Sequence, residues 1–194
     1  MLMASEEYEK NLSKIKVLIL LFLDSLEREP IRGKNLQKQI FLLLRYFGVE
    51  NGELYWLDRY GPYSKVDANL EQLALMNLVH VNDEIRITEE GRKVAEKIKG
   101  KMDEKKLKLI DEVKEWLKDL NDDELMALIC FSFPEMAVES RELERIRRKR
   151  RMLAVSLYVK GKVSLEKAAD IAGMNLVNFM NFLRRGKVPI ELGL

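Results

Sequence analysis

The chain has 194 residues, of which 47% are apolar and only 4 are proline, so it can bury the core of one large domain or two small ones. Its single cysteine, Cys130, excludes a disulfide framework and cysteine-rich zinc sites, and its single histidine, His80, excludes two-histidine motifs. The single threonine, the three glutamines and the excess of Lys and Glu are typical of proteins from organisms that grow at high temperature.

The longest apolar run of the sequence is too short to cross a membrane. It covers residues 17–23 and so has seven residues, whereas a spanning helix needs about 20. The run follows three glutamates and ends at Asp24, so it also lacks the basic start of a secretory signal. We therefore expect a buried helix segment in a cytoplasmic protein that has no membrane partner.

Apolar residues at helical spacing predict three helices in the first part of the chain. Pro30 ends the first helix, Gly48 is expected to end the second, and Ser64 is expected to cap the third. A short extended piece and a turn are predicted between the second and third helices. The helices cover about residues 8–28, 34–47 and 66–77, the extended piece residues 53–57, and the turn residues 60–63.

A β-hairpin and a fourth helix complete this region. Apolar and polar residues alternate over 79–81 and 85–87, on either side of a turn at Asn82-Asp83. Thr88 follows as the predicted N-cap of the fourth helix. Helix, helix, helix, hairpin, helix is the order of a winged helix-turn-helix. We therefore predict a mainly α protein in which residues 1–100 form a winged-helix domain with a small β-hairpin wing.

Three motifs stand out in this region. The most specific is Tyr-Gly-Pro-Tyr-Ser at residues 60–64, and it is accompanied by Leu-Gln-Lys-x-x-Phe-Leu-Leu at residues 36–43 and Thr-Glu-Glu-Gly-Arg at residues 88–92. Together they resemble the YwgA and Panacea-type domains, and the resemblance covers roughly residues 10–100. It implies a regulatory or antitoxin-associated module rather than a catalyst.

Two further helices are predicted within residues 101–140. An apolar stripe that includes Leu107, Ile110 and Leu117 marks the first, and Asn121-Asp122-Asp123 breaks the run and caps the second. We expect this segment to be a helical spacer that could also offer a dimer surface.

Charge is distributed unevenly along the chain. Residues 141–194 hold 13 Lys and Arg against 5 Asp and Glu, a net charge of +8, whereas residues 1–140 hold 21 against 27, a net charge of −6. Such a basic end predicts contact with a polyanion, although a solvated helix face paired with Glu142 and Glu144 is the alternative. The densest cations are Arg145, Arg147, Arg148, Lys149, Arg150 and Arg151.

The same 141–194 segment carries a helix-turn-helix pattern. Ser164 is the predicted cap of the first helix, Ala169 is small where two helices cross, and Gly173 suits a turn with positive φ. A preceding helix is expected to complete the core. The predicted core positions are Met152, Val155, Leu157 and Val159 in the preceding helix, and Met174, Val177, Phe179, Phe182 and Leu183 in the second helix of the motif.

Polar residues recur on one face of this second helix. Asn amides can bind adenine in the major groove, and Arg can bind guanine or phosphate. The alternative is that these side chains only cover the surface, with Asn175 as a helix N-cap. The predicted DNA-binding residues are Asn175, Asn178, Asn181, Arg184 and Arg185.

The C-terminal segment contains four short sequence marks, Val-Ser-Leu-Tyr at residues 155–158, Gly-Lys-Val-Ser-Leu at 161–165, Ala-Ala-x-x-Ala-Gly-Met at 168–174 and Phe-x-x-Phe-Leu at 179–183. With these marks it resembles small antitoxin-like helix-turn-helix proteins that are encoded beside PIN-domain toxins. Such proteins are usually short, and an attached winged helix departs from that pattern. The departure favours a stand-alone regulator over an antitoxin.

Catalysis is not expected. No glycine-rich phosphate loop is present, Cys130 lies among apolar residues, and the acidic residues 122–124 suit a helix N-terminus better than a metal. We therefore expect no enzyme, cofactor or metal, but a transcriptional regulator that binds double-stranded DNA as a homodimer through residues 141–194. Arg147, Arg148, Arg150 and Arg151 would neutralise phosphates. The alternative is an antitoxin or adaptor whose N-terminal winged helix binds a toxin-like protein partner.

Overall fold

The computed structural model describes residues 12–27, 29–48, 55–58, 61–133 and 143–190. The chain forms two compact units, Met1–Lys118 and Asp119–Leu194, called here the N-terminal and C-terminal units. The sequence placed boundaries at 100/101 and 140/141 instead. The predicted spacer is divided between the units, because its first helix packs on helices of the N-terminal unit and its second on helices of the C-terminal unit.

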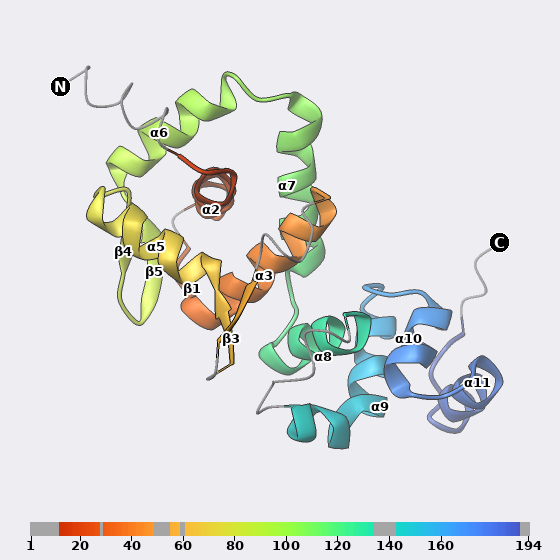
Figure 1. Cartoon of the computed structure of the whole chain (residues 1–194). Helices are drawn as coiled ribbons and strands as arrows, with labels where there is room; N and C mark the ends of the chain where they lie inside the picture. The colour runs from red at the N-terminus through yellow and green to blue at the C-terminus, as the bar shows by residue number, and fades with distance from the viewer. Residues whose placement is uncertain (1–11, 28, 49–54, 59–60, 134–142, 191–194) are drawn as a thin grey trace. The chain divides into compact units, whose positions relative to one another are not determined.

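A buried helix lies at the centre of the N-terminal unit. In α2 (Lys14–Ser25) the six successive residues 18–23 are all buried, which confirms the predicted buried segment. Helix α2 is shorter than the predicted 8–28, and residues 1–11 and 28 lie outside the described part of the chain. The helices around α2 are α3 (Gly33–Tyr46), α5 (Lys65–Leu75), α6 (Glu89–Lys99) and α7 (Glu104–Leu117) (Figure 1).

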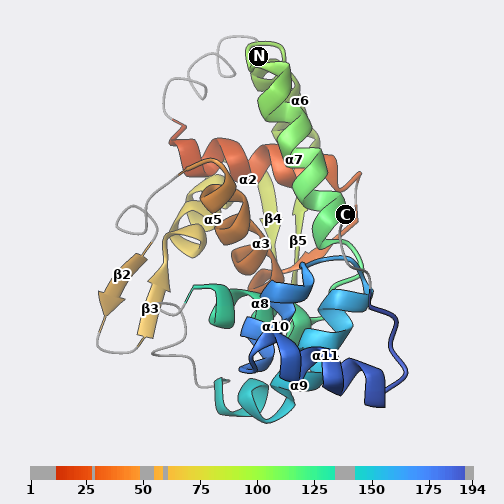
Figure 2. The ribbon, with the colours of Figure 1, turned by 90° about the vertical axis from the view of Figure 1, so that its right-hand side faces the viewer.

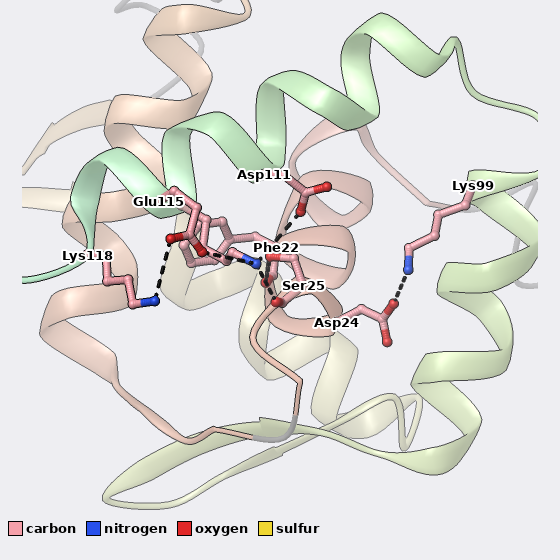
Figure 3. Close-up of polar contacts among 8 residues, drawn as sticks. Phe22, Asp24, Ser25, Lys99, Asp111, Glu115 and Lys118 are labelled. Atoms are coloured by element: carbon pink, nitrogen blue, oxygen red, sulfur yellow. Dashed lines mark hydrogen bonds and ion pairs between the residues drawn. The ribbon is translucent and has the colours of Figure 1, made fainter.

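Two lysines fix the C-terminal end of α2 to its neighbours (Figure 3). Lys99 of α6 pairs with Asp24 at 2.5 Å, and Lys114 of α7 donates to the backbone carbonyl of Ser25 at 3.0 Å. Burial alone would lower the pKa of Lys99, but the carboxylates of Asp24 and Glu96 raise it above its ordinary value. Both contacts hold α6 and α7 against the same core helix.

The predicted wing is present as an antiparallel hairpin of β4 (Val79–Val81) and β5 (Glu84–Ile87). A third strand, β1 (Ile31–Arg32), pairs with β5, so the sheet order is β1-β5-β4. The hydroxyl of Thr88 accepts from the Gly91 amide at 2.9 Å and donates to the Asn77 carbonyl at 2.8 Å, which confirms the predicted cap of α6. Three helices, an edge strand and a hairpin form the predicted winged-helix arrangement.

Along the sequence, a second β-ribbon lies between α3 and α5, and it projects to one side of these two helices (Figure 2). It consists of β2 (Tyr55–Asp58) and β3 (Gly61–Ser64), paired antiparallel. The extended piece was predicted, but the predicted turn over residues 60–63 is wrong, because residues 61–63 belong to β3. Gly48 has φ +70° just after α3, which confirms the predicted end of that helix. The side chain of Ser64, the predicted cap of the third helix, lies outside the described side chains. The ribbon makes the connection between α3 and α5 much longer than a helix-turn-helix turn.

In the described residues of the C-terminal unit, all the regular secondary structure is helical. It comprises α8 (Asp122–Ser132), α9 (Leu143–Val159), α10 (Leu165–Ala172) and α11 (Leu176–Arg185). Asn121 caps α8 as predicted, and Glu124 completes a capping box by accepting from the Asn121 amide at 2.8 Å. Among the predicted core residues of α9, Leu157 is buried, but Met152 and Val159 are 66% and 64% exposed. The buried stripe of α9 instead contains Ile146, Leu153, Ala154 and Leu157.

Candidate nucleic-acid interface

Helices α10 and α11 form the predicted helix-turn-helix, and their turn is held by specific hydrogen bonds. The Ser164 hydroxyl caps α10 by accepting from the Lys167 amide at 3.2 Å. At the other end, Gly173 N donates to the Asp170 carbonyl and Met174 N to the Ala169 carbonyl, both at 3.0 Å. This pair of bonds is the Schellman motif, which stops a helix with a residue in the left-handed region. Gly173 has φ +69°, as predicted.

The close approach of Arg150 also favours glycine at position 173. A Cβ atom at this position would lie 2.5 Å from Nη1 and 2.6 Å from Cζ of Arg150. Any side chain here would therefore displace the guanidinium of Arg150. The turn between α10 and α11 thus depends on glycine for its backbone conformation and for the approach of an arginine from α9.

The two faces of α11 differ sharply in exposure. Phe179 and Leu183 are fully buried and attach the helix to the rest of the unit. The opposite face is exposed and contains Val177, Asn178, Asn181, Arg184 and Arg185. The structure therefore brings four of the predicted DNA-binding residues to one surface. It also adds Val177, which the sequence assigned to the core.

Asn175 has a structural role at the start of this helix. It is the N-cap of α11, and its Oδ1 accepts from the Asn178 amide at 2.8 Å. Farther along α11, Arg184 donates to Oδ1 of Asn181 at 3.4 Å. The exposed polar face is therefore partly ordered by its own hydrogen bonds.

Arg150 is engaged within the protein. Its Nε donates to the Ile171 carbonyl at 2.8 Å and its Nη2 to the Asp170 carbonyl at 3.1 Å, while Cζ lies 4.4 Å from the centre of the Phe131 ring. Burial, together with the charges of Arg147 and Arg151, lowers the pKa of Arg150. Arg150 thus stabilises the C-terminal end of α10, a role different from the predicted phosphate contact.

Several neighbouring cations of α9 are paired with carboxylates. Arg145 hydrogen-bonds to Asp123 of α8, Lys149 pairs with the same carboxylate at 3.1 Å, and Arg147 pairs with Glu144 at 3.1 Å. The hydrogen bond from Arg145 contributes most to lowering the pKa of Asp123. The predicted alternative, a solvated face paired with acidic residues, therefore accounts for part of the cluster. The acidic partners are Glu144, as predicted, and Asp123, which was not predicted. Glu142 lies outside the described residues.

Arg148 and Arg151 are the remaining cations of the cluster. Both are exposed, and within the described ranges neither makes a hydrogen bond or ion pair with another side chain. They are therefore available for an external anion.

A basic hollow joins the α9 cations to the helix-turn-helix. Its volume is about 500 Å³, and its lining comes from α9, from the end of α10 and from α11. Phe182 borders it, one helical turn from both Asn178 and Arg185 on α11. A phosphate chain in this hollow would lie beside the exposed face of α11. The lining residues are Arg147, Arg148, Lys149, Arg150, Arg151, Met152, Ala172, Gly173 and Phe182.

In the described part of the chain, no helix has the length and apolar character needed to span a membrane. The same residues contain no cluster of three or more potential metal ligands from His, Cys, Asp and Glu. The buried carboxylate of Glu124 is instead paired with Lys160 at 2.7 Å and also accepts from Ser156.

Comparison with curated proteins and with solved structures gave no match. Residues 126–194 match the model of an uncharacterised protein family, UPF0175. The matched segment contains α9, α10 and α11, and therefore the whole of the surface described above.

Proposed function

We propose that the protein is a transcriptional regulator that binds double-stranded DNA through the α10–α11 helix-turn-helix. The observation that carries this proposal is the continuity of the exposed α11 face with the basic hollow. In a helix-turn-helix the second helix enters the major groove while nearby residues contact the backbone. The C-terminal unit offers both kinds of surface side by side.

Each part of this surface has a role in the proposal. Asn178 and Asn181 would contact base edges, where an amide can both accept from and donate to adenine. Arg184 and Arg185, in the last turn of α11, would contact guanine or phosphate. Asn175 would hold the helix start, with its Oδ1 on the Asn178 amide. We assign no catalytic, cofactor or metal role to these residues.

The phosphate contacts are assigned to fewer arginines than the sequence indicated. Arg148 and Arg151 are the leading candidates because they are exposed in the hollow and lack a described partner. Arg147 can exchange its exposed ion pair with Glu144 for a phosphate, since such pairs contribute little to stability. Arg150 is assigned no phosphate contact, because its guanidinium is engaged by carbonyls at the end of α10 and by the Phe131 ring.

Replacing Arg148 and Arg151 with alanine tests the phosphate contacts. Each phosphate contact contributes about 0.9 to the slope of log affinity against log salt. The double variant should therefore lower that slope by about 2. The matched control is Lys105→Ala/Lys106→Ala, which removes two exposed cations from α7 of the N-terminal unit. An unchanged slope in the first variant, or an equal fall in the control, would contradict the assignment.

We also propose that the regulator is a cytoplasmic homodimer. A single ten-residue recognition helix offers a small interface, and two linked half-sites multiply affinity. Sedimentation of the protein with and without DNA tests this point. A monomer in both conditions, bound at one protein per duplex, would contradict it.

A second candidate function is an antitoxin or adaptor whose N-terminal unit binds a protein. The observation that favours it is the surface of α5, the third helix of the winged helix. Among the described side chains of this helix, the exposed ones are Glu71, Gln72 and Leu75, and Leu75 is 88% exposed. Asp67 and Asn69 are already bonded within the unit, to Gln37 and Ser13. An apolar and acidic surface suits a protein better than DNA.

The resemblance to YwgA-type domains and to antitoxin-like proteins encoded beside PIN-domain toxins supports this second candidate. Coexpression with the product of the neighbouring gene tests it. Copurification that is lost in Leu75→Asp would support an adaptor, whereas a neighbour that does not copurify would leave only the regulator.

A further inference from the structure

The first turn of α11 presents apolar side chains to solvent. Leu176 and Val177 are 36% and 66% exposed. Because successive residues of an α-helix are about 100° apart, Val177 is directed roughly opposite to the buried Phe179. The valine therefore contributes little to the attachment of α11, and it lies on the outer face.

The neighbours of Val177 on this face are amides and cations. Asn178 follows it in sequence, Asn181 lies one turn farther on, and Arg184 donates to Asn181. The basic hollow borders the other side of the face at Phe182. An apolar patch within such a basic surface matches a polyanion that itself carries apolar groups.

Thymine supplies such a group in the major groove. Its C5-methyl lies at the groove edge, and the adenine paired with it offers an N7 acceptor and an N6 donor. One A·T pair therefore presents a partner for a valine methyl and a partner for an asparagine amide. Residues at the N-terminal end of a recognition helix are those that reach base edges. RNA carries uracil and lacks the methyl group.

We propose that α11 selects A·T base pairs in duplex DNA, with Val177 against a thymine methyl and the Asn178 and Asn181 amides on adenine. This inference rests on the proposed DNA-binding function and specifies what the same surface recognises. Oδ1 of Asn181 retains a lone pair for adenine N6 while it accepts from Arg184, because a carbonyl oxygen has two.

The first test is selection from a pool of duplexes with 20 randomised base pairs, using the full chain. Selected duplexes are expected to share a run of A·T pairs. They are then synthesised with deoxyuridine in place of one thymidine at a time, which removes only the methyl group. Loss of a contacted methyl should weaken binding about fourfold, the value expected for one buried methyl group.

Two variants assign the effect to the valine. Val177→Ala should bind the thymidine and deoxyuridine duplexes equally, within twofold. Val159→Ala removes a valine of similar exposure, 64%, from α9 and should retain the fourfold preference for thymidine. Far-UV circular dichroism checks that both variants are folded.

The outcomes separate this inference from the function on which it rests. Absence of binding to any duplex at low salt would overturn both. Binding without enrichment of A·T pairs, or equal binding of thymidine and deoxyuridine duplexes by the unaltered chain, would overturn only the base preference. A thymidine preference that persists in Val177→Ala would overturn the role of the valine.

Discussion

Alanine substitution should affect different properties at Arg150 and Arg151, two adjacent arginines of α9. Arg150→Ala removes two hydrogen bonds to the carbonyls of Ile171 and Asp170 and the stacking on Phe131. Arg151→Ala removes an exposed cation without a described partner. The first substitution should therefore lower stability, whereas the second should lower DNA affinity.

The magnitude follows from the contacts. We take about 1 kcal/mol for each carbonyl hydrogen bond, because the guanidinium is half-exposed, and about 0.5 kcal/mol for the ring contact. The total of about 2.5 kcal/mol corresponds to a fall of roughly 10 °C or more in the melting temperature of a unit of this size. Arg151→Ala should change stability by no more than about 0.5 kcal/mol and reduce the salt slope of DNA binding by about 0.9.

The assay can separate the two units by their chromophores. Both tryptophans, Trp56 and Trp116, belong to the N-terminal unit, so tryptophan fluorescence reports that unit, while far-UV circular dichroism reports all helices. The transition seen by circular dichroism should shift in Arg150→Ala. A melting temperature within 2 °C of the original, together with a reduced salt slope, would refute the structural role and restore the phosphate contact for Arg150.

Two further predictions concern stability. Gly173→Ala should destabilise more than Gly161→Ala, because both have positive φ but only the Cβ at Gly173 would meet Arg150. We expect about 1 kcal/mol for Gly161→Ala and about 2 kcal/mol for Gly173→Ala, measured by urea unfolding. Acid should destabilise the C-terminal unit: burial raises the pKa of Glu124, but Lys160, Ser156 and the Asn121 amide hold it below the ordinary 4.5. The contribution of the Glu124 carboxylate to stability should therefore be complete above about pH 5.5 and be lost as the pH drops below 4.5.

Each of these predictions has a matched control. In an Arg150→Ala background, the two glycine substitutions should cost the same, and a persisting difference would refute the proposed clash. Glu124→Gln should flatten the loss of stability in acid, measured as melting temperature against pH. A variant with an unchanged acid profile would show that Glu124 does not carry the effect.

Local signals in the sequence predicted most elements of the fold. Residue chemistry alone identifies caps such as Thr88, Asn121 and Ser164, and Gly173 is identified by the turn that it must form. Strand β1 was missed because two residues after Pro30 are too few to show alternation, and its pairing with β5 joins distant segments. The sequence also placed α7 and α8 in a spacer, since amphipathic stripes do not reveal which neighbour covers them.

The candidate site was predicted less completely. Helical spacing identified the face with Asn178 and Asn181, but apolar character alone placed Val177 in the core. A helical projection about Phe179 and Leu183 could have placed this valine on the exposed face. The contacts of Arg150 depend on the position of α9 beside the end of α10, and sequence spacing cannot supply that position.

The most direct measurement of the central claim is fluorescence anisotropy of the full chain on duplex DNA. One duplex comes from the region upstream of its own gene and the other is a scrambled duplex of equal length, each titrated at three salt concentrations. We expect the upstream duplex to bind at least about 10³-fold more tightly than the scrambled one. Equal and steeply salt-dependent binding of the two duplexes would mean that basic residues bind phosphates and that α11 recognises no sequence. Absence of binding to either duplex at low salt would contradict the account.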